Sequence, residues 1–340
     1  MPTQSIISTT LQLLRDKLVD NSYLAHPLIR SIEEHGNLVK VAGGQRIDQP
    51  VIFGETTSIT ELSTGWEAVN MAVRDPFHTA TFDWANFTQP IIINAVEKAA
   101  NKGDLAVVSI LESKMKNVML SLKKEVSKQI IRGDSSVLGS LETLNGMGTA
   151  ASAVDTTGWF QSAAFGLQAT NTVGGLSKGT FAAQNWQNQV FNSSGTLALS
   201  HLDELMIQCQ IFNPSGAFPD ILLMSPSCYS AFMALQQSAV RYVSRGDQKS
   251  LDADMVGEWR GARIYIEPQL GFNNAAGTPV SAYALSSDQF QLYADTDGFF
   301  NVSEMLPVPG TASEAAMVFN RMQLVTGHLA SHGVLLNAEA

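Results

Sequence analysis

The sequence contains two segments with the alternation expected of long β-strands, VKVAGGQRIDQPVIF at residues 39–53 and TATFDWANFTQPIII at residues 79–93. In the second segment, Phe82 and Trp84 flank Asp83, so apolar and polar side chains would point to opposite faces of a strand. The residues between the two segments are mostly polar and too poor in large side chains to form a core. We therefore predict a long two-stranded ribbon with a polar tip.

A ribbon of only two strands is marginally stable in water. Something outside the ribbon must cover its large side chains, because in a monomer they would be a liability. The candidate contact residues are Trp66, Met71, Phe82 and Trp84.

The hydrophobic period becomes helical after Asn94. Apolar residues recur at intervals of three and four from Val108 to Ile130, which predicts one helix about 40 Å long that ends near Gly133. Against two acidic residues, Glu112 and Glu125, its outer faces carry a set of basic residues: Lys114, Lys116, Lys123, Lys124, Lys128 and Arg132. A solvated helix face and a surface that faces nucleic acid both remain open as interpretations.

The chain on either side of these elements has weaker patterns. Apolar residues between Leu11 and Ile32 fall at helical spacing with breaks at Asn21 and Pro27, which predicts an arm of short helices. Residues 145–195 are rich in Gly, Ala, Ser, Thr and Asn and predict loops and short strands.

A mixed α/β lobe is predicted next. One helix face carries Leu202, Leu205, Met206 and Cys209. The apolar strand Ile221–Met224 is followed by a helix with Ser225 as N-cap and Pro226 at its first position. A hairpin at residues 259–262 leads into another strand at residues 263–267.

The end of the sequence is rich in strands, expected at residues 282–285, 290–294, 299–305 and 317–329. Strands near both ends of the chain then need partners. We therefore expect the α/β lobe to be an insertion, with the two termini together in the first lobe.

Composition narrows the function. The chain has 340 residues, of which 45% are hydrophobic, enough for two compact lobes. A net charge of −10 and a pI near 5.0 exclude a protein that binds nucleic acid or an anionic membrane through its overall charge, so any DNA contact is local. Cys209 and Cys228 lie in aliphatic surroundings, which favours reduced, buried thiols. The sequence shows neither a signal peptide nor an apolar run long enough for a membrane span.

Two short motifs resemble a phosphate-binding loop and a calcium-binding loop, but neither has the residues that such a loop requires. GLSKGT at residues 175–180 lacks the Gly-Lys-Ser/Thr order of a phosphate-binding loop. DTDG at residues 295–298 begins like a calcium loop, but Phe299 and Phe300 follow where ligands are needed, so a turn between strands is expected.

Two residue combinations that could bind a metal or catalyse a reaction are also rejected. His328 and His332 have the spacing of a zinc-binding helix, but nearby glycines and the strand context exclude that helix. Cys209 or Cys228 with His201 would make a nucleophile and a base, yet thiols on an apolar helix face usually only pack. We expect no catalytic residue, no metal site and no cofactor.

The order of arm, ribbon, long helix, inserted lobe and returning strands resembles the tailed-phage coat proteins of the Hong Kong 97-type fold. The extended loop of such subunits is similar to GGQRIDQPVIFGE at residues 43–55, followed by Phe82-Asp83-Trp84. The start of their spine helix and the segment after it are similar to EKAANKGD at 97–104 and LGSLETLNG at 138–146. Their axial lobe is similar to residues 219–221, 226–242 and 261–267.

The resemblance implies an α+β subunit in four parts. They are an N-terminal arm (1–38), an extended loop (39–93), a peripheral domain of spine helix and β-sheet (94–150 and 300–340), and an inserted mixed α/β axial domain (151–299).

The function that the resemblance implies is structural. Such a subunit forms hexamers and pentamers that close an icosahedral capsid around double-stranded DNA in the bacterial host cytoplasm, with procapsid maturation. The implied partners are other copies of the chain, a portal, a scaffolding protein, packaged DNA through non-specific contacts, and in some shells a decoration protein, with no membrane. An encapsulin-like host compartment that holds protein cargo is the alternative.

Two finer expectations concern assembly. The segment before the ribbon is too short for a large internal scaffold, so a separate scaffolding protein, or none, and little proteolytic trimming are expected. Some relatives join a loop Lys to an Asn of a neighbour. No Lys lies between Lys40 and Lys98 here, so such cross-links are not expected.

Overall fold

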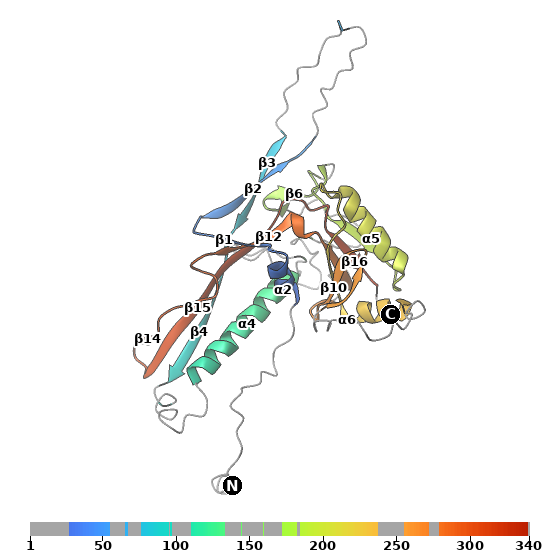
Figure 1. The fold of residues 1–340 in the computed structure, drawn as a ribbon. Helices are drawn as coiled ribbons and strands as arrows, with labels where there is room; N and C mark the ends of the chain where they lie inside the picture. The colour runs from blue at the N-terminus through green and yellow to red at the C-terminus, as the bar shows by residue number, and fades with distance from the viewer. Residues whose placement is uncertain are drawn as a thin grey trace. The chain divides into compact units, whose positions relative to one another are not determined.

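The computed structural model describes residues 27–54, 65–66, 76–94, 96, 110–132, 144, 159, 172–181, 184–236, 255–271 and 279–338 (Figure 1). This part of the chain is mixed α/β and divides into two compact units. The smaller unit takes its described residues from Phe87–Lys124 and Phe300–Asn320. The larger unit takes its described residues from Ala25–Asn86, Glu125–Phe299 and Arg321–Ala340.

A six-stranded mixed sheet forms the core of the larger unit. Its strands are, in spatial order, β7 (Gln189–Asn192), β16 (Gly333–Leu336), β11 (Val280–Leu285), β8 (Ile221–Met224), β10 (Ala262–Ile266) and β9 (Met255–Trp259). Every residue of β8, β11 and β16 is buried. Continuous apolar strands of this kind belong to a sheet that is covered on both faces.

Two helices, α5 (Leu199–Phe212) and α6 (Pro226–Gln236), pack on this sheet. The α5 residues that are buried are the predicted ones, Leu202, Leu205, Met206 and Cys209. The Ser225 hydroxyl accepts a hydrogen bond from the Cys228 N–H at 3.1 Å, which is the geometry of an N-cap. The helix periodicity and the cap predicted from sequence are confirmed here.

The predicted hairpin at residues 259–262 joins β9 to β10. Arg260 and Gly261 both have positive φ, 49° and 86°, as a two-residue turn between twisted strands requires. The Arg260 guanidinium donates to both carboxylate oxygens of Asp203 on α5, at 2.5 and 2.8 Å. This pair lowers the pKa of Asp203 and ties the turn to the helix.

A second sheet is built around the long strand β15 (Ser313–Thr326). Its other strands are β1 (Leu38–Val41), β12 (Phe290–Asp295), β13 (Asn301–Val302), β14 (Leu306–Pro307) and β4 (Ala85–Asn94). β1 runs parallel to β12, and β12 runs antiparallel to β15.

The predicted long helix is confirmed as α4 (Ile110–Arg132), with Leu122, Val126 and Ile130 buried. The end of the predicted arm is a helix as well, α2 (Pro27–Glu34), which buries Leu28 and Ile32. Residues 1–26 of the arm lie outside the described part. None of the described helices is long and apolar enough to span a membrane.

The ribbon consists of β2 (Arg46–Ile52) and β3 (Phe77–Asp83), paired antiparallel from Arg46↔Asp83 to Ile52↔Phe77. It is shorter than predicted, because β1 pairs with β12 and β4 pairs with β15 instead of continuing the ribbon. The alternation of apolar and polar residues identifies a strand but not the strand with which it pairs. The prediction from sequence therefore assigned all four strands to one ribbon.

Two strands belong to a different sheet from the one that the expected domain boundaries would give them. β12 lies within residues 151–299 but belongs to the β15 sheet, and β16 lies within residues 300–340 but belongs to the β8 sheet. Of the strand expected at residues 299–305, only Asn301–Val302 is regular. The four-part division stays a prediction.

Candidate functional site

The inner face of the ribbon is buried against its own chain. Phe82 is 1% exposed. The Thr81 N–H donates to the carbonyl oxygen of Gly174 at 2.8 Å, beside the small hairpin of β5 (Thr172–Val173) and β6 (Leu176–Ser177). A Cβ on Gly174 would lie 2.8 Å from both the Ala80 Cβ and the Phe82 ring, so only glycine permits this approach.

An aromatic cluster continues the same contact beyond the end of β2. The Phe53 ring stacks on Phe181 with centroids 4.6 Å apart and meets Trp186 edge-on at 5.4 Å. His78 packs 4.9 Å from Phe181. The segment around Gly174 and Phe181 therefore supports the ribbon along its inner face.

The outer face of the ribbon is exposed and apolar at the end away from Arg46. Ile52 and Phe77 are opposite each other and are 66% and 67% exposed. Further along the chain, Trp66 is 94% exposed, while Met71 lies outside the described residues.

The four contact residues named from sequence thus differ in environment. Trp66 is available to a partner, whereas burial inside the chain leaves Phe82 and Trp84 little surface to offer one. Sequence reasoning did not single out Ile52 and Phe77. The alternation of β2 could have indicated Ile52, because it lies on the face opposite Val51, which is buried.

A second exposed apolar surface belongs to the smaller unit. On β15, Met317 and Phe319 are exposed and alternate with the buried residues Ala316 and Val318. The exposed apolar residues of this unit include Ile92, Val96, Leu306, Met317 and Phe319. A sheet with one apolar face in water has surface for another protein.

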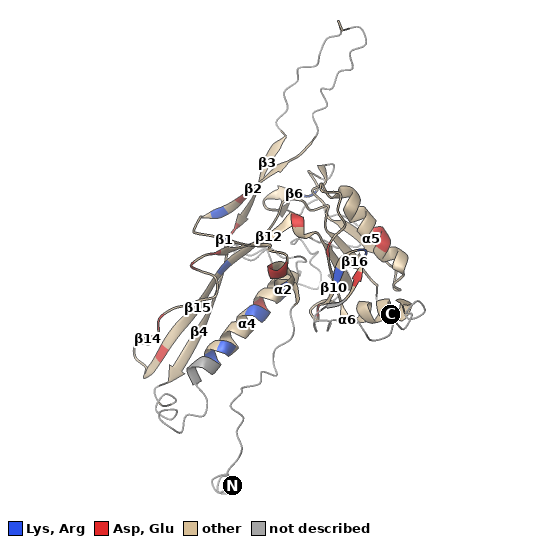
Figure 2. Cartoon of the chain, viewed as in Figure 1, with Lys and Arg blue, Asp and Glu red and all other residues tan. Residues whose placement is uncertain are grey.

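Figure 2 shows several positions of Lys and Arg, coloured blue, along α4. Lys116, Lys123, Lys124 and Lys128 are exposed. Lys114 is partly buried, and its ammonium donates to the carbonyl of Ile92 at 3.0 Å. Of the exposed four, Lys123 lies 5.8 Å from the centre of the Phe300 ring and Lys128 lies 3.6 Å from Glu125. The side chain of Arg132 is not described.

Lys178 of the GLSKGT motif packs inside the larger unit and does not face a phosphate site. It is 1% exposed, donates to the carbonyl of Trp159, and lies 3.2 Å from Oδ1 of Asn188. At the DTDG turn, Asp295 accepts from Arg321 at 3.3 Å.

His328 and His332 lie between β15 and β16, not on a helix, as predicted. The His332 ring stacks on Trp159 with centroids 5.6 Å apart, its Nδ1 accepts from the Ser286 N–H at 3.2 Å, and Nε2 lies 3.4 Å from Thr326 Oγ1. Burial, and secondarily the neighbouring His328, lower the pKa of His332 to about 3. Burial also lowers the pKa of His328, against a smaller opposing effect of Asp288. No group of metal-ligating residues occurs in the described ranges.

The cysteines are packing residues. Cys209 and Cys228 form no disulfide and have no exposed surface. Burial raises the pKa of Cys209 to about 12, which keeps it protonated and unreactive at neutral pH. His201 accepts a hydrogen bond from the Ala198 N–H at the start of α5.

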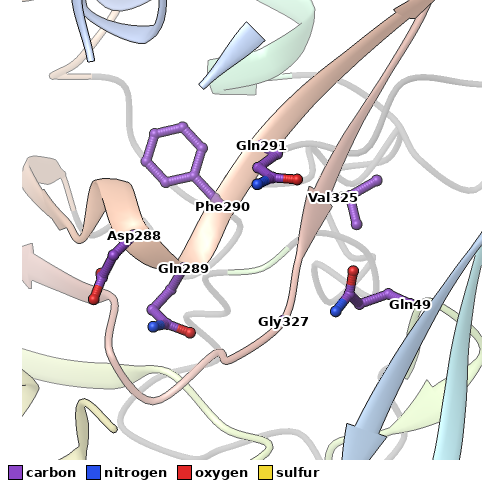
Figure 3. Close-up of a pocket in the computed structure, with 7 residues that line it drawn as sticks. All are labelled: Gln49, Asp288, Gln289, Phe290, Gln291, Val325 and Gly327. Carbon is purple, nitrogen blue, oxygen red and sulfur yellow. The ribbon is translucent and has the colours of Figure 1, made fainter. Parts of the chain in front are cut away.

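A small cavity of about 120 Å³ opens between the ribbon and β12 (Figure 3). Its lining residues are Gln49, Asp288, Gln289, Phe290, Gln291, Val325 and Gly327. Among the described residues of this lining, Asp288 is the single ionisable group.

No family model and no curated protein sequence matches this chain. Solved structures match it over nearly its whole length. The capsid of cyanophage A-1(L) matches with a TM-score of 0.64 and 12% identity, covering 98% of this chain and 97% of that one. The capsid of Myoviridae phage XM1 matches with a TM-score of 0.56 and 9% identity, covering 96% of each chain.

An encapsulin complex from Synechococcus elongatus also matches, with a TM-score of 0.60 and 11% identity, over 98% of this chain and 95% of that one. At these identities the likeness concerns the fold. The chain has the fold of phage major capsid proteins, and the encapsulin complex shares that fold.

Proposed function

We propose that this chain is the major capsid protein of a tailed bacteriophage, which assembles as hexamers and pentamers into an icosahedral shell around double-stranded DNA. The observation that supports the proposal best is the exposed apolar surface of the ribbon. The chain covers its inner face and leaves Ile52, Phe77 and Trp66 in water.

Apolar burial is the driving force of this assembly. Covering one large aliphatic or aromatic side chain contributes about 1.5–3 kcal/mol. Each contact is weak, but a closed shell repeats it at every subunit, so the total is large although each subunit contributes little. The exposed residues Met317 and Phe319 of the smaller unit offer a second such surface.

The basic residues of α4 are proposed to face the packaged DNA. Lys116, Lys123, Lys124 and Lys128 are exposed on an acidic chain, so they form a local positive surface. Contacts of Lys to phosphates neutralise charge without reading sequence, which suits a shell that holds any genome.

The proposal extends to the family's other parts. A portal and a separate scaffolding protein would act during assembly in the host cytoplasm, the product would be the virion capsid, and a decoration protein would bind some shells. An extended loop, a spine helix in a peripheral domain and an axial lobe are proposed on the same grounds, with β2–β3, α4 and the β8 sheet as their counterparts.

A cellular compartment is the second candidate, because an encapsulin complex matches 98% of the chain. The contents of the particle separate the two. Particles purified from cells that express the chain with its genomic neighbours are expected to contain nuclease-resistant double-stranded DNA and to carry a tail. Particles that contain a folded enzyme and no DNA would contradict the phage assignment and support the compartment.

A further inference from the structure

The direction in which the ribbon leaves the larger unit is determined at two places, and both lie within that unit. The first place is the root, where the chain enters β2 and leaves β3. The second is the inner face, which rests on the segment around Gly174 (Figure 1).

At the root, Arg321 of β15 contacts both ends of the ribbon. Its guanidinium lies 4.7 Å from the centre of the Trp84 ring, just after β3, and its Nη2 donates to the carbonyl of Gly44, just before β2, at 2.6 Å. Nη1 lies 3.3 Å from a carboxylate oxygen of Asp295, and the other oxygen accepts from the Gly43 N–H at 3.5 Å. One planar cation therefore holds the entry and the exit of the ribbon against β12 and β15.

The chain at the root is locally adaptable. Gly43 and Gly44 both have positive φ, 72° and 102°. A Cβ added to Gly43 would meet no atom within 4 Å, and one added to Gly44 would lie 3.9 Å from its nearest neighbours. Two glycines in this conformation would let the ribbon swing if nothing else held it. Arg321 supplies a side-chain constraint at this entry, whereas at the exit Trp84 alone separates β3 from the paired strand β4 and Gln323 donates to the carbonyl of Asp83.

The inner face supplies the second constraint. The hydrogen bond from Thr81 to Gly174 and the stack of Phe53 on Phe181 lie along the ribbon from its root. A body held at two separated points cannot rotate about either one without breaking the other contact.

We infer that the ribbon holds one fixed orientation in the free subunit, and that Arg321 is the residue that positions it. The neighbouring subunit then receives a preformed surface and does not have to order one, which lowers the entropy cost of each contact. The inference concerns the isolated chain, so it can fail or hold independently of the shell assignment.

The test measures the distance between the ribbon and the β8 sheet in the unassembled subunit. Nitroxide labels are attached at Thr79→Cys on the exposed face of β3 and at Glu258→Cys on exposed β9. The native thiols are buried and do not compete for label. Dilution with unlabelled subunit removes distances between copies, and pulsed electron resonance gives the distance distribution.

One narrow distribution is expected in the otherwise native chain, and at least a twofold wider one in Arg321→Gln. Arg263→Gln is the matched control, because Arg263 is 46% exposed and lies 3.9 Å from Glu34. It should keep the native width. A broad distribution in the native chain would overturn the inference, as would an unchanged width in Arg321→Gln.

If Arg321→Gln does not fold, the native distribution still decides whether the ribbon is preset. Arg321→Lys then tests the clamp, because it keeps the positive charge but loses the planar guanidinium that contacts Gly44, Asp295 and the Trp84 ring together. A width equal to the native one in this variant would overturn the role of Arg321.

Discussion

Ile52 and Phe77 lie directly opposite each other on the two strands of the ribbon, and both are exposed for about two-thirds of their surface. Of the neighbouring residues on the same strands, Val51 is buried and His78, its pairing partner, packs against Phe53 of the chain's own aromatic cluster. The ribbon thus has one face that stabilises the subunit and one that serves a partner.

Changing the outer pair to acid should prevent assembly without unfolding the subunit. In the double variant Ile52→Asp/Phe77→Asp, each contact loses at least about 3 kcal/mol of apolar burial and must bury charge. Sedimentation should show soluble subunits in place of particles, with an unchanged thermal midpoint. The control Ile52→Val/Phe77→Leu keeps an apolar surface and should assemble. Normal particle yield from the acidic variant would show that the outer face of the ribbon is not needed for assembly.

Gly333→Ala should destabilise the larger unit. A Cβ at this position would lie 2.6 Å from Sγ of Cys209 and 2.7 Å from Cδ1 of Leu205, atoms of the packed core beneath α5. Overpacking of this kind costs about 1–3 kcal/mol. Chemical denaturation measures it, and Gly327→Ala is the control, because the φ of Gly327 is not in the left-handed region and a Cβ there would lie at an ordinary contact distance, 3.6 Å, from Nε2 of Gln49. Equal stability of Gly333→Ala and the native chain would mean that α5 does not pack on β16 as described.

Stability should fall as the pH drops below about 6.5. Folding lowers the pKa values of His328 and His332, so the unfolded chain binds their protons more tightly and acid favours unfolding. For His332 the loss approaches about 1.4 kcal/mol per pH unit between its unfolded pKa of 6.5 and its folded pKa of about 3.

The comparison variant for this pH dependence is His332→Gln, which cannot take up a proton. Between pH 7 and pH 5, the free energy of unfolding should change less with pH for the variant than for the native chain. The same slope in both chains would show that His332 is not buried in its neutral form.

Mature shells should contain no covalent cross-links through the extended loop. The sequence has no Lys between Lys40 and Lys98, and the guanidinium groups of Arg46 and Arg74 stay protonated and are poor nucleophiles. Boiled particles should run on a denaturing gel as monomers of 36.6 kDa. A ladder of covalent oligomers would refute this prediction.

Charge reversal on α4 should weaken DNA retention. In Lys123→Glu/Lys124→Glu/Lys128→Glu, repulsion of phosphate replaces attraction, and the defect should be largest at low salt, where charges are screened least. Packaged DNA per particle is the measurement. The triple Arg variant keeps the charges and should package normally. Equal DNA content in the Glu variant at every salt concentration would leave these lysines as a solvated helix face.

The sequence predicted the local elements well where one strong period is present. The apolar face of α5, the Ser225 cap and the strand Ile221–Met224 all follow from nearest-neighbour patterns. Long-range pairing carries no such signal. Nothing in the segment 85–94 shows that β4 leaves the ribbon for β15, more than 200 residues away.

The candidate site was only partly predictable for the same reason. Phe82 and Trp84 look like exposed ribbon residues until Gly174 and Arg321, both distant in sequence, are brought against them. The covering segment around Gly174 lies in the stretch of small and polar residues whose structure the sequence does not specify. Once those residues are in place, the exposed pair is Ile52 and Phe77.

Electron microscopy of the purified chain, expressed with its genomic neighbours, tests the central claim most directly. Closed icosahedral particles built of hexamers and pentamers are the predicted result. A chain that stays monomeric, or forms only open aggregates, under conditions in which its fold is intact would contradict the claim that it builds a shell.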